Sequence, residues 1–88
     1  MAKSKYTDKE VFDQIMSIAY TVVPALKSKN VTMNSTMADD LGLDSLNFVM
    51  IICKIEALYG IKFDDKKWEK LSSMSEVVAE TQRLIAKK

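Results

Sequence analysis

The sequence predicts an all-α fold: a small four-helix bundle, three main helices and one short one, with a long loop between the first two main helices. Three separate segments carry apolar residues at helical spacing. Two of them open with the residues of a capping box. The chain also has only two glycines and one proline, which disfavours a sheet protein rich in turns. With 88 residues, 48% of them hydrophobic, we expect residues 1–88 to form a single domain.

The first main helix is predicted over residues 8–23. Thr7 and Glu10 have capping-box spacing, in which the hydroxyl and the carboxylate satisfy free amides at a helix start. Apolar residues then recur every three or four positions, at Val11, Ile15, Ile18, Ala19 and Val22. Pro24 lacks an amide proton and disfavours helical geometry at the residue before it, so it should end or kink this helix.

Residues 26–43 are rich in Ser, Thr, Asn, Asp and Lys and are predicted to form the long loop. A loop of this length in a compact domain usually has a function or is anchored to the core. We expect Val31 and Met37 to be the anchors.

The second main helix is predicted over residues 45–59, with Gly60 placed for a left-handed cap. It is apolar on two sides. Its core face should hold Phe48, Ile52, Ile55 and Tyr59, flanked by Val49, Ile51 and Leu58. The opposite side carries an outer stripe made of Leu46, Met50, Cys53 and Ala57. Either neighbouring loops cover this stripe, or it is a docking surface that begins at Ser45.

A short helical turn is predicted over residues 65–71, with Trp68 as its core anchor. Ser73 and Glu76 then form a second capping-box pattern before the final helix. Its apolar positions are Val77, Val78, Leu84 and Ile85.

Several function classes are disfavoured by composition. The net charge is only +1, and the lysines are not concentrated on one face with aromatic residues, so we expect no nucleic-acid partner. The longest apolar run, residues 48–53, is too short to cross a bilayer. A single cysteine excludes an internal disulfide, and the first five residues lack the apolar core of a secretory signal, so we expect a cytoplasmic protein.

Ser45 is the most informative residue, because it stands at the start of the second main helix beside Asp44 and a flexible glycine turn at Gly42. One interpretation is that Ser45 only caps this helix, which is worth ~1 kcal/mol. Nucleophilic catalysis is disfavoured, because the chain has no histidine to serve as the base. The other interpretation is that the hydroxyl is offered to another enzyme.

Residues 39–46, Asp-Asp-Leu-Gly-Leu-Asp-Ser-Leu, resemble the acyl carrier protein family. Supporting matches are Val31, residues 59–63 and residues 71–73, and the resemblance extends from the first helix to the last. It implies that a phosphopantetheinyl synthase, which recognises Asp44, attaches 4′-phosphopantetheine from coenzyme A to Ser45. The chain would then be a monomeric carrier, not an enzyme, that holds acyl intermediates as thioesters for acyl-transferring and ketosynthase-type enzymes. The many methionines would be ordinary core, or an interior that opens to shelter the tethered acyl chain.

The chain also departs from the family. Carriers of fatty acid synthesis are strongly acidic along the second helix, whereas Glu56 is the only acid of this one. Phe48 is bulkier than the residue usual at its position. These departures favour a dedicated pathway, such as specialised fatty acid or polyketide-like assembly. A peptidyl or amino-acyl carrier, or a helical interaction module in which Ser45 is only a cap, remain alternatives. The residues expected to contact partner enzymes are Leu46, Asn47, Met50, Cys53, Glu56, Ala57 and Phe63.

Overall fold

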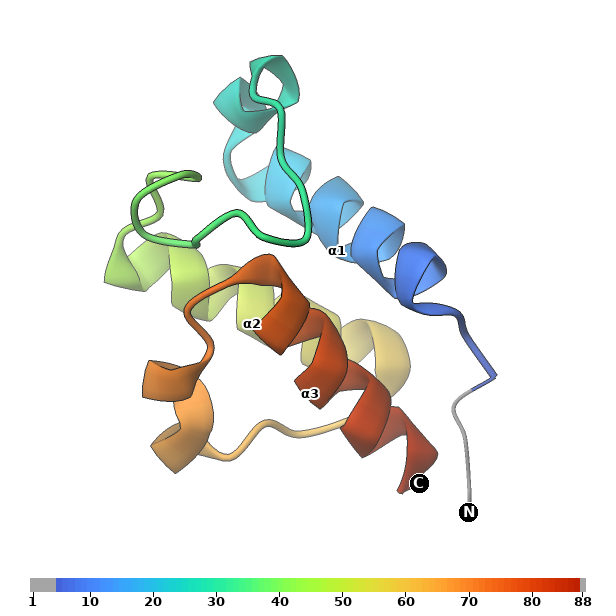
Figure 1. The fold of residues 1–88 in the computed structure, drawn as a ribbon. Coiled ribbons are helices and arrows are strands. Elements are labelled where there is room, and N and C mark those ends of the chain that lie inside the picture. Colours follow the sequence, from blue (N-terminus) through green and yellow to red (C-terminus); the bar gives the residue numbers. More distant parts are fainter. Residues whose placement is uncertain (1–4, 88) are drawn as a thin grey trace.

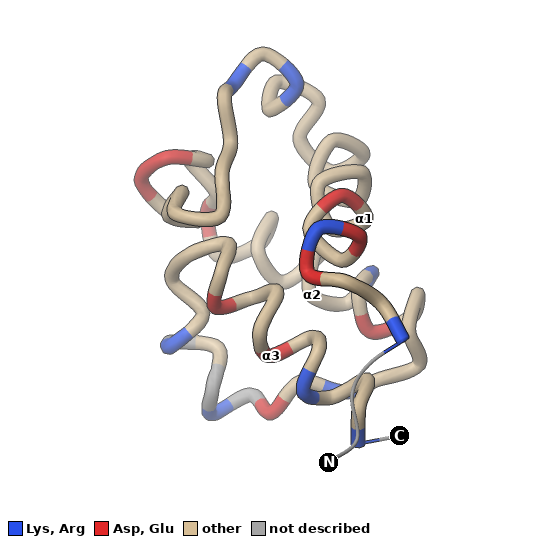
Figure 2. The backbone as a smooth tube through the Cα atoms, turned by 45° about the vertical axis from the view of Figure 1, so that its right-hand side comes forward, with Lys and Arg blue, Asp and Glu red and all other residues tan. Residues whose placement is uncertain are grey.

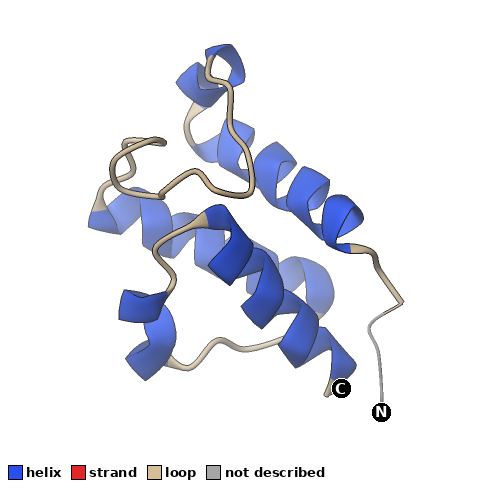
Figure 3. Ribbon diagram, viewed as in Figure 1, coloured by secondary structure: helices blue, strands red, loops and turns tan. Residues whose placement is uncertain are grey.

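The computed structural model describes residues 5–87, apart from the side chains of three residues in the short helix after the second main helix. Its elements in chain order are α1 (Asp8–Val22), the 3₁₀ helix η1 (Pro24–Ser28), α2 (Ser45–Tyr59), the 3₁₀ helix η2 (Asp65–Lys70) and α3 (Met74–Ala86). Within residues 5–87 the only β-type pairing is one isolated bridge, between Thr36 and Ser73. The predicted all-α fold is therefore confirmed, and Figure 3 shows helices joined by loops.

The three α-helices contribute their buried side chains to one core. α1 contacts both α2 and α3, and Figure 1 shows α3 lying across α2 with α1 beside them. The fully buried aliphatic side chains include Val11 and Ile15 of α1, Ile51, Ile52 and Ile55 of α2, and Val77 and Val78 of α3. Burying one such side chain contributes about 1.5–3 kcal/mol. These residues lie on the faces that the helical spacing predicts, whereas Phe48, expected on the core face of α2, and Trp68, expected as a core anchor, are only half-buried.

The first helix boundary differs slightly from the prediction. α1 ends at Val22 instead of residue 23, and the chain then enters η1, which the sequence analysis did not anticipate. Pro24 is the first residue of η1, where its missing amide proton costs no hydrogen bond. The proline thus ends one helix and starts a short one, which places Leu26 in the core with no exposed surface.

The long loop is anchored to the core and to the start of α3. Met37 is buried, and Val31 is half-buried against the core, as predicted. Main-chain hydrogen bonds tie the loop to the chain before and within α3: the Met37 amide donates to the Ser72 carbonyl at 2.8 Å, and the Ser75 amide donates to the Met33 carbonyl at 2.8 Å. Figure 1 shows the loop passing beside this end of α3. A segment of polar residues is thereby held in one conformation.

Both predicted N-cap residues, Thr7 and Ser73, accept a hydrogen bond from the main chain of their helix. The Glu10 amide donates to the Thr7 hydroxyl at 3.1 Å and the Thr7 amide donates to the Glu10 carboxylate at 2.9 Å, which completes the capping box of α1. At α3, the Glu76 amide donates to the Ser73 hydroxyl at 3.4 Å. Gly60 closes α2 in the left-handed conformation, with φ of 65°.

Candidate functional site

The structure places Ser45 as the first residue of α2, with its side chain exposed. The cap of this helix is Asp44, whose carboxylate accepts a hydrogen bond from the Asn47 amide at 2.8 Å. The interpretation of Ser45 as the cap is therefore wrong, because Asp44 fills this structural role. Among the described residues no hydrogen bond engages the Ser45 hydroxyl. This hydroxyl is available for chemistry with a partner.

The turn before Ser45 is held by burial on both sides of Gly42. Leu41 is 2% exposed and Leu43 is 7% exposed, so two leucines anchor the turn in the core. Gly42 between them has φ of 69°, a left-handed conformation that side chains with a Cβ rarely adopt. The Lys29 ammonium donates to the Asp40 carbonyl at 3.2 Å and so ties the turn to the chain after η1. Ser45 is thus presented from a fixed turn.

Asp40 also has a structural role in this segment. Its carboxylate accepts from the Thr36 amide at 2.8 Å, and its own amide donates to the Thr36 hydroxyl at 3.1 Å. Asp39 and Asp44 are exposed as well, so negative charge gathers on the loop that leads into α2 (Figure 2). A basic partner surface would be attracted to this end of the helix.

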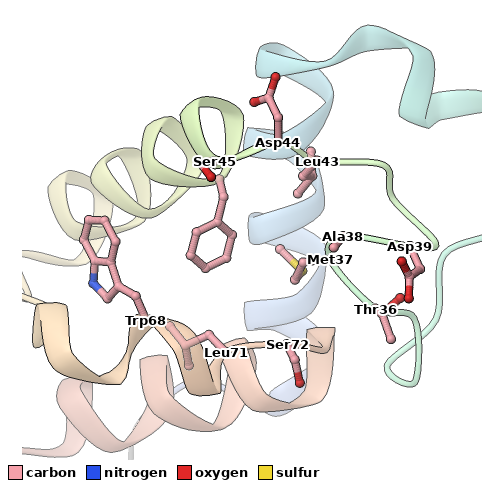
Figure 4. A pocket seen from close by; sticks show the side chains of 11 residues that line it. Thr36, Met37, Ala38, Asp39, Leu43, Asp44, Ser45, Trp68, Leu71 and Ser72 are labelled. Atoms are coloured by element: carbon pink, nitrogen blue, oxygen red, sulfur yellow. The ribbon is translucent and has the colours of Figure 1, made fainter.

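A pocket of about 340 Å³ opens beside Ser45. Its lining includes the apolar side chains of Met37, Leu43, Phe48, Trp68 and Leu71, and its polar lining includes Thr36, Asp39 and Ser72. Figure 4 shows that Met37 and Leu43 come from the long loop, whereas Trp68 and Leu71 come from the segment before α3. A mostly apolar pocket with a hydroxyl at its edge can take an apolar group attached to that hydroxyl.

The outer stripe of α2 is exposed, as one of the two interpretations expected. Leu46 is 68% exposed and Met50 is 42% exposed, and Cys53 and Ala57 are exposed with them. Leu58 differs from the prediction: it is 50% exposed instead of flanking the core. It lies about 120° around α2 from Leu46, between the stripe and the buried face, and the described neighbours leave half of it uncovered. The apolar exposed surface of α2 is therefore broader than the four-residue stripe.

Two residues expected at the partner surface have structural roles. Phe63 is 1% exposed and packs in the core, so it offers a partner no surface, and its assignment there is corrected. The Glu56 carboxylate accepts a hydrogen bond from the Phe63 amide at 2.7 Å and holds the chain as it leaves α2. Asn47 is half-buried at the start of the same helix. Since Glu56 is bound to the backbone, α2 presents no uncommitted acid, and its one base is the exposed Lys54.

The described part of the chain shows no group of three or more His, Cys, Asp or Glu side chains that could hold a metal ion. None of the helices described is both long and apolar enough to cross a membrane. The candidate site therefore consists of the Ser45 hydroxyl, the acidic residues of the preceding loop, the pocket and the exposed apolar side of α2.

The chain is similar to known proteins of one family. Residues 21–80 match the family model described as a phosphopantetheine attachment site. An acyl carrier protein of Thermotoga maritima is 34% identical over 71 residues, covering 81% of this chain and 86% of the relative. One from Rhodococcus erythropolis is 31% identical over 81 residues, covering 92% of this chain and 88% of the relative.

The fold matches a solved structure from Anaplasma phagocytophilum, a protein studied as a candidate acyl carrier protein. The TM-score is 0.74 with 21% identity, over 90% of this chain and 92% of the other. At this identity the likeness supports the helical fold and not the function.

Proposed function

The chain belongs to the acyl carrier protein family, and we propose that Ser45 is the residue to which its 4′-phosphopantetheine is attached. The domain of this family carries that group covalently, and its members are carriers and not catalysts. The observation that supports Ser45 is its free, exposed hydroxyl at the first position of α2, where Asp44 has taken over the capping role. The arm would hold acyl intermediates as thioesters.

The start of α2 suits a phosphodiester. Helix amides without intrahelical partners, together with the helix dipole, favour negative charge at this end. The modifying synthase would supply coenzyme A and the base that takes the Ser45 proton. Asp44 is close in sequence and exposed, and beyond capping α2 it would be read by the basic groups or metal ion of that synthase.

A dedicated pathway is the second part of the proposal. The exposed side of α2 is apolar, and Lys54 is its only charged side chain that is not bonded within the fold. An enzyme whose basic docking surface binds carboxylates on this helix would therefore have no free carboxylate to bind. We propose that the outer stripe, with Asn47 at its border, contacts acyl-transferring or ketosynthase-type enzymes that present an apolar patch. Specialised fatty acid or polyketide-like assembly fits such a partner.

The attachment is tested by intact mass after incubation of the chain with coenzyme A and a promiscuous phosphopantetheinyl synthase. We expect a mass increase of one phosphopantetheine group, located by proteolysis and fragmentation on the peptide that contains Ser45. Modification of another serine, or no modification, would contradict the proposal.

The partner surface is tested separately with Met50→Glu in the loaded protein. Acyl transfer by enzymes of general fatty acid synthesis should improve, because the new carboxylate gives their basic surfaces a partner. Salt should reduce this gain, since exposed charges are screened over about 10 Å at 0.1 M. Ala79→Glu, an exposed position on α3, is the matched control and should change nothing. If these enzymes transfer acyl groups equally fast with Met50→Glu and with the unsubstituted protein, the outer stripe is not part of the partner surface.

A further inference from the structure

Lys54 carries the one charge on the exposed side of α2 that the fold leaves without a partner. The one acid of this helix, Glu56, is bonded to the Phe63 amide at 2.7 Å, and no described residue pairs with the Lys54 ammonium. Met50, four residues before Lys54, is 42% exposed, and Leu58, four residues after it, is 50% exposed. Residues four apart are neighbours on a helix surface. These three side chains therefore form an exposed row, apolar, basic and apolar, which we call the Lys54 row.

A protein that covers the Lys54 row also covers the ammonium group. At about 100° per residue, Met50 lies about 40° to one side of Lys54 and Leu58 about 40° to the other. Ala57, which is exposed as well, lies on the Met50 side. A lysine at the border of an interface can extend its stem and keep its ammonium in water, but a surface that packs on both sides of Lys54 closes that path. A charge removed from water has to be paired, because burying it unpaired is costly.

We propose that the enzyme that docks on α2 presents a carboxylate opposite Lys54, set in an apolar patch that covers Met50 and Leu58. The inference rests on the proposed docking of acyl-transferring or ketosynthase-type enzymes on the outer stripe, and it adds the chemistry of the partner surface. Such a surface recognises this chain by opposite charge. The same lysine disfavours an enzyme with a basic docking surface, because like charges that meet in an interface repel each other.

A second copy of the chain fits the Lys54 row less well. Lys54 lies two residues from the middle of α2, which spans Ser45–Tyr59. If two copies packed α2 against α2, antiparallel about a two-fold axis, their Lys54 residues would lie within about 6 Å of each other along the helices. The exposed side of α2 offers neither ammonium a free carboxylate. The carboxylate therefore has to come from another protein.

The experiment uses ketosynthases of general fatty acid synthesis and of specialised acyl assembly as probes, each assayed with the loaded chain. The enzyme with the highest kcat/KM for the unsubstituted chain is then assayed with the variants. Lys54→Met keeps an unbranched side chain and removes the charge, whereas Lys54→Arg keeps the charge, and both residues favour helices. Lys27→Met is the matched control, because it makes the same change at an exposed lysine of η1. Circular dichroism and intact mass establish folding and loading.

Lys54→Met should raise KM at least about tenfold and leave kcat unchanged, because docking loses a charge pair while the chemical step keeps its contacts. Lys54→Arg and Lys27→Met should stay within about twofold of the unsubstituted chain. The effect of Lys54→Met should persist in about 1 M salt, since buried pairs are screened much less than exposed ones.

A zero-length carbodiimide, which joins an amine directly to a carboxylate, gives a readout that does not depend on acyl transfer. It should link Lys54 to an Asp or Glu of the enzyme, identified by peptide fragmentation. Because this cross-link needs no arm, it is measured with the unloaded chain as well.

An unchanged KM for Lys54→Met, an effect abolished by salt, or cross-links from Lys54 to a second copy instead of the enzyme would overturn the inference. Docking on the outer stripe would survive these outcomes if Met50→Glu still weakens use by the same enzyme. If Met50→Glu also leaves KM unchanged, or no ketosynthase uses the loaded chain, the docking proposal fails and the inference with it. Absence of a mass gain would contradict the attachment at Ser45, whereas the cross-link of the unloaded chain would still decide the role of Lys54.

Discussion

The starts of α1 and α2 differ by one residue in where they place a hydroxyl, and that difference separates a hydroxyl that bonds within the fold from one that does not. At α1, Thr7 occupies the cap, and its hydroxyl accepts from the Glu10 amide at 3.1 Å. At α2, Asp44 occupies the cap, and Ser45 follows as the first helical residue with its hydroxyl unengaged by the described residues. A hydroxyl at the cap stabilises its own helix, whereas one position later it is available to another molecule.

The start of α3 follows the pattern of α1. Ser73 is the cap, and its hydroxyl accepts from the Glu76 amide. Each of the three α-helices in residues 5–87 has a hydroxyl residue at its N-cap or first position. Only α2 is capped by a carboxylate, that of Asp44. The comparison explains how Ser45 can be both at a helix start and free.

The largest expected effect comes from exchanging the two hydroxyl residues for alanine. Ser45→Ala should abolish the mass gain with coenzyme A and the synthase, with stability changed by no more than about 0.5 kcal/mol, because no bond of the fold is lost. Thr7→Ala should leave the mass gain intact and cost ~1 kcal/mol, which lowers Tm by about 4–8 °C in a domain of this size. Intact mass and thermal unfolding of both variants measure the contrast. Mass gain in Ser45→Ala would place the attachment elsewhere.

The next prediction separates two roles of Asp44: capping α2 and presenting a negative charge to the synthase. Asn is as good a cap as Asp, so Asp44→Asn should unfold at nearly the original temperature, whereas Asp44→Ala should cost ~1 kcal/mol. If the synthase recognises the carboxylate, both variants should be modified at least about tenfold more slowly, since a hydrogen bond to a charged group contributes about 1.5–3 kcal/mol. Initial rates by mass spectrometry test this. A normal rate in Asp44→Asn would leave Asp44 with the cap alone.

The sequence was sufficient for the helices and for Ser45 as a candidate, because these depend on local patterns. Apolar spacing located three helices, and the capping boxes located two of their starts. Most of what it missed depends on contacts outside the helices: that Glu56 bonds to the Phe63 amide and that Phe63 is buried follow from how the chain turns after α2. That Asp44 and not Ser45 caps α2 is a local choice that the sequence leaves open, because aspartate and serine are about equally good caps. The 3₁₀ helix at Pro24 could have been found, since proline favours the first position of a helix.

A smaller effect concerns the two glycines that bracket α2. Gly42 and Gly60 both have positive φ, 69° and 65°, so alanine at either should cost about 1 kcal/mol or more. Only Gly42 lies in the turn that presents Ser45, so Gly42→Ala should also slow modification, whereas Gly60→Ala should not. Thermal unfolding and modification rates of both variants are compared. Equal rates would show that the synthase does not need this turn in its native conformation.

The smallest effect is expected at the start of α3 and only in acid. Hydrogen bonds from the Ser72 hydroxyl, and then from Ser73, lower the pKa of Glu76 below its ordinary value of 4.5. A lowered folded-state pKa contributes stability that is present above 4.5 and is lost as the pH falls below it through the folded value. Glu76→Gln should therefore lower Tm slightly at neutral pH, and the difference should shrink as the solution is acidified. Because Ser72 supplies the main contact, the effect of Glu76→Gln should be smaller in a Ser72→Ala background. A difference in Tm that is the same at neutral and acidic pH would assign the effect of Glu76 to packing instead of charge.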